Sequence, residues 1–158
     1  CAKSRKGHFE GVIDVMNRLT NIIKPKKIYM GEKDFQQLYL VKKYIKKKNR
    51  TKIVFCKTIR DRNKLAFSSR NKLLSKMDLI KAGKISEEMI SFKKSLIKNR
   101  DIKNLIIKKK KQLVNTFTIK FDYMELRNVL TLKTSDKMKN SKLFLAYYIK
   151  KVRLIDNF

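Results

Sequence analysis

The sequence predicts an α/β fold in its first half and a smaller α+β region in its second half. In the first half, two segments with apolar residues at three- and four-residue spacing are each followed by a short apolar run typical of a strand. Helix, strand, helix and strand in succession favour a parallel sheet with crossover helices. In the second half, helical segments come first and strand-like segments follow. That order favours a separate α+β domain.

The first helix is predicted from Val12 to Ile23, because its apolar residues recur with the period of an amphipathic helix. Pro25, the only proline in the chain, ends this helix. The segment KKIYMG then forms a short strand that ends at Gly31. A glycine at this point begins a loop at the carboxyl end of a strand, where ligands bind in parallel α/β sheets.

A second helix is predicted from Asp34 onward, with an apolar stripe formed by Leu38, Val41 and Ile45. The cations of KKKNRT close it, where the helix dipole favours positive charge. KIVFCKTI is the next strand, and its continuous apolar run predicts a buried central position. The thiol of Cys56 in this run is therefore expected to be buried like a small hydrophobic group.

Helical periodicity extends from Leu73 to Asn115, with an expected break near KAGK. The lysine run at 108–111 favours a solvated helix face over a binding patch. Four strand-like segments complete the chain: FTIKFDYMEL, VLTLKT, LFLAYYI and VRLIDN. We place the domain boundary near Asn71 to Ser75, which predicts one domain over residues 1–72 and a second over residues 73–158.

The chain is strongly basic, with 42 Lys and Arg against 13 Asp and Glu and a net charge of +29. Such a charge suggests nucleic acid or an anionic membrane as a partner. However, 33 of the basic residues are Lys, whereas recognition of bases and phosphates favours Arg, and they spread along the whole chain. We therefore favour a solvated basic surface without specific nucleic-acid binding, and keep a basic nucleic-acid-binding module as the alternative.

Cysteine usage and hydropathy narrow the class of protein further. Cys1, Cys56 and the single histidine, His8, form no metal-binding pattern, so no metal site is predicted. No apolar run is long enough to span a membrane, and the first residues lack the apolar region of a signal peptide. We expect a cytoplasmic protein without a membrane partner, and a chain that begins inside a larger protein.

The stretch MGEKDFQQLYL, residues 30–40, has two interpretations. In the first, Asp34 caps the helix, Gln37 completes a capping box, and Gly31 and Lys33 are a turn residue and a surface charge. In the second, the glycine lets backbone approach a ligand, while the helix start and Lys33 attract a phosphate. The spacing alone does not decide between them.

The stretch SSRN, residues 68–71, has a similar pair of interpretations. Two hydroxyl groups and a guanidinium at a helix start suit a polyphosphate. A capping serine beside a surface arginine explains the same residues, and in isolation that explanation is favoured.

Taken together, five segments resemble the carboxyl-terminal half of the bacterial pantothenate synthetase family, the pantoate–beta-alanine ligases. These segments are SRKGHFEGV, GEKDFQQLYLV, LAFSSRN, FDYMELR and RLIDN, and the resemblance runs from Ser4 to Asn157. It implies part of a Rossmann-like nucleotidyltransferase sheet followed by a small C-terminal lid domain. It also implies an ATP-dependent, AMP-forming ligase that condenses (R)-pantoate with beta-alanine to pantothenate through a pantoyl-adenylate and releases pyrophosphate.

The resemblance also implies roles for individual residues. ATP would be bound by the residues that match the family's nucleotide site: Gly31, Glu32, Lys33, Asp34, Ile59, Phe67, Ser68, Ser69 and Arg70. Of these, Lys33, Ser68, Ser69 and Arg70 would stabilise the charge that develops on the phosphates. Gln37 would bind pantoate. Mg²⁺ would arrive with ATP, and the complete enzyme is expected to be a homodimer.

Four departures from the family pattern affect these implications. Asn63 and Lys64 stand where the family usually has Asp-Gly, and Phe67 stands where it often has methionine. The proline of the family's Arg-Pro-Gly-His pattern is lost before His8, which leaves this histidine as either a substrate ligand or a structural residue. The family's amino-terminal half, with its GxxHxGH-type loop and a second pantoate glutamine, is missing.

We therefore expect negligible activity from this chain alone and a missing amino-terminal half as its partner. A decayed ligase that keeps only the fold is the remaining alternative.

Overall fold

The computed structural model describes residues 7–48, 51–97, 99 and 101–158. Two compact units divide the chain, Cys1–Thr58 and Ile59–Phe158. Among the described residues, no helix combines the length and the apolar character needed to cross a membrane.

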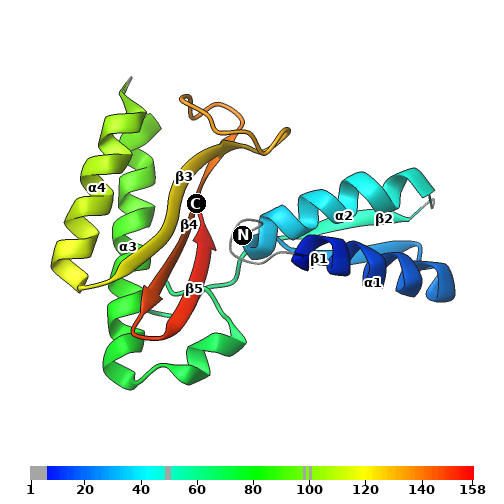
Figure 1. Cartoon of the computed structure of the whole chain (residues 1–158), viewed down its shortest axis with the longest axis horizontal. Helices are drawn as coiled ribbons and strands as arrows, with labels where there is room; N and C mark the ends of the chain where they lie inside the picture. The colour runs from blue at the N-terminus through cyan, green and yellow to red at the C-terminus, as the bar shows by residue number, and fades with distance from the viewer. Residues whose placement is uncertain (1–6, 49–50, 98, 100) are drawn as a thin grey trace. The chain divides into compact units, whose positions relative to one another are not determined.

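The first unit is a parallel pair of strands with two helices (Figure 1). Its elements are α1 (His8–Ile23), β1 (Lys27–Gly31), the short 3₁₀ turn η1 (Glu32–Asp34), α2 (Phe35–Lys48) and β2 (Lys52–Cys56). The strands β1 and β2 pair in parallel, with Lys27 opposite Lys52 and Gly31 opposite Cys56. The predicted order of helices and strands and the parallel pairing are confirmed.

The helix α2 buries the stripe that its periodicity predicts. Leu38, Val41 and Ile45 are at most 1% exposed, and Phe35 at the start of the helix is also buried. The helix α1 covers the predicted range but keeps much of its apolar stripe in solvent, since Ile22 is 78% exposed. The side chains of the KKKNRT segment that precede Thr51 lie outside the described residues.

The prediction that β2 is a buried central strand is wrong for this unit. Phe55 is 39% exposed, and Cys56 is an exposed free cysteine. The physical reason is that, in the part of the chain that the structure describes, β2 hydrogen-bonds to β1 alone in a two-stranded sheet. Its second edge and part of its surface therefore have no covering element within the described unit.

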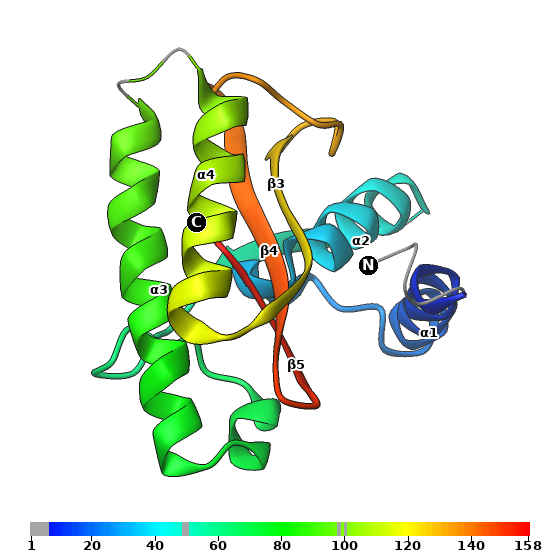
Figure 2. The same cartoon turned by 60° about the vertical axis from the view of Figure 1, so that its left-hand side comes forward.

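The second unit packs two helices against a three-stranded antiparallel sheet of order β3-β4-β5. Its elements are η2 (Ser69–Leu73), α3 (Lys76–Ile97), α4 (Ile102–Phe117), β3 (Lys120–Asn128), β4 (Ser141–Ile149) and β5 (Val152–Asn157). The helices α3 and α4 lie side by side against the sheet (Figure 1, Figure 2). This is the α+β arrangement that helices followed by strands predict.

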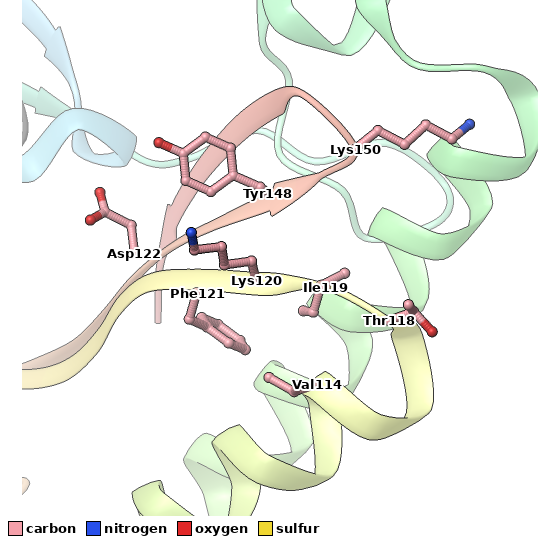
Figure 3. Close-up of a pocket in the computed structure, with 8 residues that line it drawn as sticks. All are labelled: Val114, Thr118, Ile119, Lys120, Phe121, Asp122, Tyr148 and Lys150. Atoms are coloured by element: carbon pink, nitrogen blue, oxygen red, sulfur yellow. The ribbon is translucent and has the colours of Figure 1, made fainter.

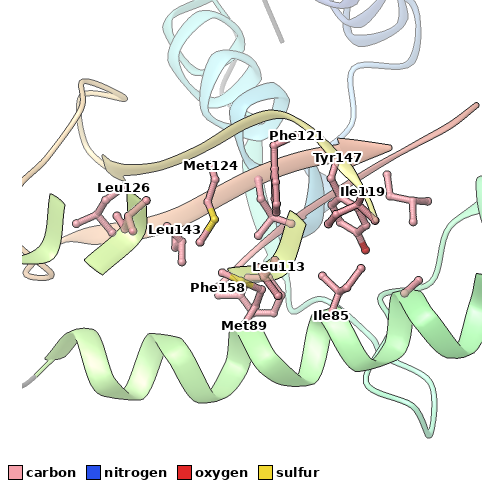
Figure 4. Packing of buried hydrophobic residues seen from close by; sticks show 14 of the residues in the cluster. Ile85, Met89, Leu113, Ile119, Phe121, Met124, Leu126, Leu143, Tyr147 and Phe158 are labelled. Carbon is pink, nitrogen blue, oxygen red and sulfur yellow. The ribbon is translucent and has the colours of Figure 1, made fainter. Parts of the chain in front are cut away.

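The core of the second unit lies between these helices and the sheet (Figure 4). Ile85 and Met89 of α3 and Leu113 of α4 are completely buried. The strands contribute apolar side chains to the same cluster, among them Met124 of β3 and Leu143 of β4. A single continuous cluster of this kind explains why α4 needs only one apolar stripe and carries lysines on its other faces.

The helix break expected near KAGK does not occur. Helix α3 runs without interruption through Gly83. A Cβ built on Gly83 would lie 2.7 Å from the Cβ of Asn63 and 2.8 Å from its carbonyl oxygen. The glycine therefore allows the preceding loop to pack closely against the helix, and it marks a contact instead of a helix end. The two helices are separated by the region around residues 98–101.

The predicted strand VLTLKT is also wrong. Asn128 Oδ1 accepts hydrogen bonds from the backbone N–H groups of Leu130, at 2.8 Å, and of Thr131, at 3.2 Å, and this turn ends β3. Leu132 then has a left-handed backbone conformation with φ 58°, which is incompatible with a strand. The strands predicted in FTIKFDYMEL, LFLAYYI and VRLIDN correspond to β3, β4 and β5.

The loop before α3 belongs to the second compact unit, which begins at Ile59. Leu65 of this loop is part of the core cluster of that unit. The sequence-based boundary at residues 72/73 refers to the domains of a complete protein, and it stays a prediction.

Candidate functional site

The first group of predicted site residues lies where β1 ends and α2 begins. Gly31 is the last residue of β1, Glu32, Lys33 and Asp34 form η1, and Gln37 is in the first turn of α2. Asp34 is exposed, whereas Glu32, Lys33 and Gln37 are half-buried. The structure thus brings all five residues together at the carboxyl end of a parallel strand and the amino end of a helix, where backbone N–H groups favour anions.

The capping-box interpretation of this stretch is not supported. Within the described residues, the side chains of Asp34 and Gln37 form no capping hydrogen bond. The reason is that η1 leads directly into α2 at Phe35, which places Asp34 inside a helical segment instead of at its flanking position. Such 3₁₀ turns commonly begin α-helices.

Neither the backbone conformation nor the packing within the described unit requires a glycine at Gly31. Its φ of −70° and ψ of 132° are open to any residue. A Cβ built there would meet no heavy atom within 4 Å beyond its chain neighbours. The space beside Gly31 is therefore open, as it would be if a ligand approaches the backbone at this point.

The second group of predicted site residues lies on the loop that opens the second unit. The N–H of Phe67 donates to the carbonyl of Ile59 at 3.1 Å, so these two residues lie across a narrow loop. Both side chains project into solvent, with 72% of Ile59 and 62% of Phe67 exposed. Solvent-exposed apolar side chains on a loop are able to pack against the flat face of an aromatic ring such as adenine.

Ser68 caps η2, as its position before a helical turn predicts. Its Oγ accepts a hydrogen bond from the N–H of Arg70 at 3.3 Å. Ser69 is exposed, and Arg70 donates from Nη1 to the carbonyl of Arg153 at 3.4 Å. Two hydroxyl groups and a guanidinium therefore lie together at the start of a short helical turn. The first and second groups belong to different compact units.

The same loop holds a buried ion pair that sequence reasoning missed. Arg60 donates to both carboxylate oxygens of Asp156, at 2.7 Å from Nη1 and 2.9 Å from Nη2. Asp156 is nearly inaccessible, with 5% of its side chain exposed, and Arg60 is at 19%. The RLIDN motif contains Asp156 and was a signal that this residue has a role, but no local pattern links it to Arg60.

The departure at Asn63-Lys64 has a clear conformational consequence. Lys64 has a left-handed backbone with φ 66°, a conformation that glycine adopts without cost. Its N–H donates to the carbonyl of Asp61 at 3.0 Å, and its own carbonyl accepts from Arg60 at 3.0 Å. The turn of the loop is therefore formed with a lysine in a backbone conformation that suits glycine.

Among the residues that the structure describes, three groups have shifted pKa values, and none of them is a predicted site residue. Hydrogen bonds from Lys150 and Ser75 hold the pKa of Asp78 below its usual value. Burial raises the pKa of Tyr123 and, more strongly, that of Tyr147 in the core. These shifts follow from local packing and identify no acid or base for catalysis.

A hollow at one end of the sheet contains none of the predicted site residues (Figure 3). It lies where α4 turns into β3, beside Thr118, Lys120 and Tyr148. The amino groups of its two lysines point in different directions, and Lys150 is paired with Asp78 at 2.6 Å. It is therefore a poor candidate for the nucleotide site.

The remaining candidates from the sequence add little. His8 is half-buried at the start of α1, with its ring 5.4 Å from that of Phe9, while Arg5 and Lys6 lie outside the described residues. No group of three or more metal-ligating side chains occurs among the residues that the structure covers.

Known proteins match this chain over its whole length. The family model described as pantoate-beta-alanine ligase matches residues 1–158. Pantothenate synthetase from Clostridium botulinum is 40% identical to the chain over 164 residues, covering 100% of the chain and 57% of the relative. The corresponding protein from Flavobacterium psychrophilum is 37% identical over 159 residues, covering 98% of the chain and 56% of the relative.

Solved structures give the same result. Pantothenate synthetase from Thermus thermophilus matches with a TM-score of 0.90 and 26% identity, covering 99% of this chain and 58% of that one. A Francisella tularensis pantoate-beta-alanine ligase, described as complexed with beta-gamma ATP and beta-alanine, matches with a TM-score of 0.71 and 38% identity over 99% of this chain and 52% of that one. The chain thus spans about half the length of these relatives, and it belongs to the pantoate-beta-alanine ligase family.

Proposed function

We propose that this chain supplies the carboxyl-terminal half of an ATP-dependent ligase that joins (R)-pantoate to beta-alanine. The reaction forms a pantoyl-adenylate with release of pyrophosphate, and then transfers the pantoyl group to the amine with release of AMP. The observation that carries the proposal is the family match over residues 1–158, joined to the open space beside Gly31 at a strand's carboxyl end. The ATP analogue and beta-alanine named for the Francisella tularensis structure support the substrate classes.

The proposed roles follow from the chemistry of each residue. Attack of the pantoate carboxylate on the α-phosphorus builds negative charge on the phosphate oxygens and on departing pyrophosphate. Lys33, Ser68, Ser69 and Arg70 stabilise that charge through an ammonium, two hydroxyl groups and a guanidinium. Mg²⁺ enters with ATP, held mainly by phosphate oxygens and water.

The residues that bind without reacting have separate roles in this proposal. Gly31 and Asp34 contact the nucleotide near its ribose, with Glu32 between them, and the backbone of Ile59 meets the adenine. Phe67 binds ATP as part of the loop that carries Ser68, Ser69 and Arg70. Gln37 holds pantoate through hydrogen bonds from its amide. The domains 1–72 and 73–158 then correspond to the end of a Rossmann-like nucleotide-binding domain and to a small lid domain.

The proposed partner of the chain is an amino-terminal half that completes the sheet of the first unit. Exposed apolar side chains support this proposal, since Val15, Leu19, Ile22 and Ile23 of α1 are between 46% and 78% exposed. Unpaired apolar surface of this kind marks an interaction face. We further propose a homodimer for the complete, cytoplasmic enzyme, with no specific nucleic-acid or membrane partner.

The test is pantoate-dependent release of pyrophosphate from ATP in the presence of beta-alanine and Mg²⁺. We expect negligible release by the chain alone and measurable release after addition of an amino-terminal half from a related enzyme. Turnover by the chain alone would refute the half-site proposal. Inactivity of the mixture, with association of the halves shown independently, would refute the ligase assignment in favour of a decayed protein.

Variants of the active mixture separate the proposed roles. Lys33→Ala and Arg70→Ala are expected to lower kcat/KM for ATP by roughly 100-fold, as expected when one preorganised charge-stabilising group is removed. Gln37→Ala is expected to raise KM for pantoate and to leave KM for ATP unchanged. Lys72→Ala, an exposed cation two residues after Arg70, is the matched control and should have no effect.

A further inference from the structure

The last strand of the chain contacts the Ser68–Arg70 segment in a way that the proposed reaction does not use. The strand β5 contains the RLIDN motif, and two of its residues touch the loop that carries the phosphate-binding groups. Asp156 pairs with Arg60 at the start of the loop. The carbonyl of Arg153 accepts from Arg70 at the end of the loop. Both ends of the loop are thereby attached to the same strand.

Arg60 is the central residue of the first attachment. Besides its two bonds to Asp156, it donates to the carbonyl of Lys64 at 3.0 Å, and its guanidinium lies 4.7 Å from the ring centre of Phe158. It thus holds the turn of the loop and the end of β5 at the same time. A bidentate pair with this degree of burial has one geometry, which a single lysine–carboxylate contact would not impose.

The segment between Arg60 and Ser68 is itself held by backbone contacts, which connect the Arg60–Asp156 pair to the exposed part of the loop. The backbone of Arg60 forms an isolated β-bridge with Ala66, and Asn71 Nδ2 donates to the carbonyl of Ala66 at 3.1 Å. Leu65 and Ala66 are buried, whereas Phe67 and Ser69 beyond them are exposed. The exposed residues Phe67 and Ser69 thus come directly after a segment whose backbone is held by hydrogen bonds on both sides.

The second attachment is supported from the sheet. Arg153 donates from Nη2 and Nε to Asp122 Oδ2, at 2.7 Å and 3.1 Å. Asp122 belongs to the FDYMELR motif of β3. The two motifs without an assigned role thus meet in one ion pair, next to the carbonyl that receives Arg70.

We propose that the Arg60–Asp156 pair is a positioning device for Ser68, Ser69 and Arg70, which it holds in the arrangement that binds the triphosphate of ATP. This inference rests on the proposed function. Its physical basis is that groups held in place before the ligand arrives lose less conformational freedom on binding and stay aligned in the transition state. Arg60 and Asp156 touch none of the substrates in this proposal and act through the loop.

Amide hydrogen exchange in the 158-residue chain tests the ordering of the loop. The variants are Arg60→Met and Asp156→Asn, and the control is Lys109→Met, which removes the ion pair that joins α4 to Glu88 of α3. We expect the loop amides of Leu65 and Phe67 to exchange at least about tenfold faster in the first two variants relative to the amides of α4. In the control, the loop amides should change no more than those of α4. Equal changes in the loop and in α4 for Arg60→Met would overturn the proposal.

Kinetics of the mixed halves test the link to ATP. Arg60→Met is expected to lower kcat/KM for ATP by roughly 10- to 100-fold, the scale of a displacement of about 1 Å at a reacting centre. Because Gln37 lies in the other unit, KM for pantoate should not change. Arg60→Lys keeps the positive charge but not the bidentate geometry of the guanidinium, so it should recover only part of the loss in kcat/KM. Full activity of Arg60→Met, or an equal rise in both KM values, would overturn the proposal.

The two proposals fail in different ways. If the wild-type mixture is inactive although its halves associate, the ligase function is refuted, while the exchange measurement still decides whether Arg60 orders the loop. If the wild-type mixture is active and Arg60→Met is equally active, the ligase function stands and the positioning role is refuted.

Discussion

Replacing Lys64 with glycine should stabilise the second unit, although it removes a side chain. Lys64 has φ 66°, and a residue with a Cβ in the left-handed region loses about 1–2 kcal/mol. Glycine avoids that cost but loses about 0.4–1 kcal/mol through the greater freedom of the unfolded chain. The hydrogen bonds that Lys64 forms in the structure use its backbone, so no side-chain hydrogen bond or ion pair is lost. We therefore expect a net gain of about 0.5–1 kcal/mol in the free energy of unfolding.

Lys64→Ala is the matched control, because it removes the charge and the long side chain but keeps the Cβ. It should be as stable as the wild type or slightly less so. The measurement is urea unfolding followed by NMR signals of residues 59–158, so that unfolding of the first unit does not enter. With a slope of about 2 kcal/mol per molar urea, the midpoint of Lys64→Gly should rise by about 0.3–0.5 M.

A midpoint for Lys64→Gly at or below that of Lys64→Ala would refute the reasoning, because it would show that the left-handed conformation is not the source of strain. The same variant bears on function in the active mixture of halves. A modest change in rate is expected if the loop path is already correct. A large gain in rate would instead favour the view that this chain has decayed from an active ligase.

The remaining predictions concern contacts within the second unit. Gly83→Ala should lower the free energy of unfolding by about 1–3 kcal/mol despite the better helix propensity of alanine, because its Cβ would overlap Asn63, and thermal unfolding will measure this. Asp156→Asn should cost about 3 kcal/mol, the scale for leaving one partner of a buried ion pair alone, whereas a loss below about 1 kcal/mol in urea unfolding would contradict the burial of the pair. The pKa of Asp78 lies below its usual value of 3.8, because its ionised form is paired with Lys150. This pairing stabilises the fold above pH 3.8, and the stabilisation is lost as the pH falls through the lower pKa of the folded state. Asp78→Asn should therefore lower stability at pH 7 and flatten the dependence on pH below about 4, whereas an unchanged acid dependence would contradict the assignment.

Local patterns in the sequence were enough to predict much of the fold. The stripe of Leu38, Val41 and Ile45 has the period of one helix face, and all three residues are buried as that period requires. The parallel pairing of β1 and β2 followed from the helix between them, because a crossover connection joins parallel strands. For the candidate site, position at strand ends and helix starts predicted that Gly31 to Gln37 lie together and that Ser68 caps a turn.

Other features were decided only by tertiary contacts. The glycine in KAGK suggests a helix break from the sequence, but α3 continues through it, and the loop residue Asn63 packs where a side chain would otherwise lie. VLTLKT has the composition of a strand, but the side chain of Asn128 bends the backbone into a turn.

The pair of Arg60 and Asp156 is the clearest case, because 96 residues separate its members in the chain. Periodicity and spacing describe neighbours along one helix or strand, whereas an ion pair between a loop and a distant strand depends on how the whole unit packs. The sequence by itself thus determined the family, the order of helices and strands and the residues proposed to meet the substrates. The tertiary structure decided how the loop that carries Ser68, Ser69 and Arg70 is held, since only folding brings β5 against that loop.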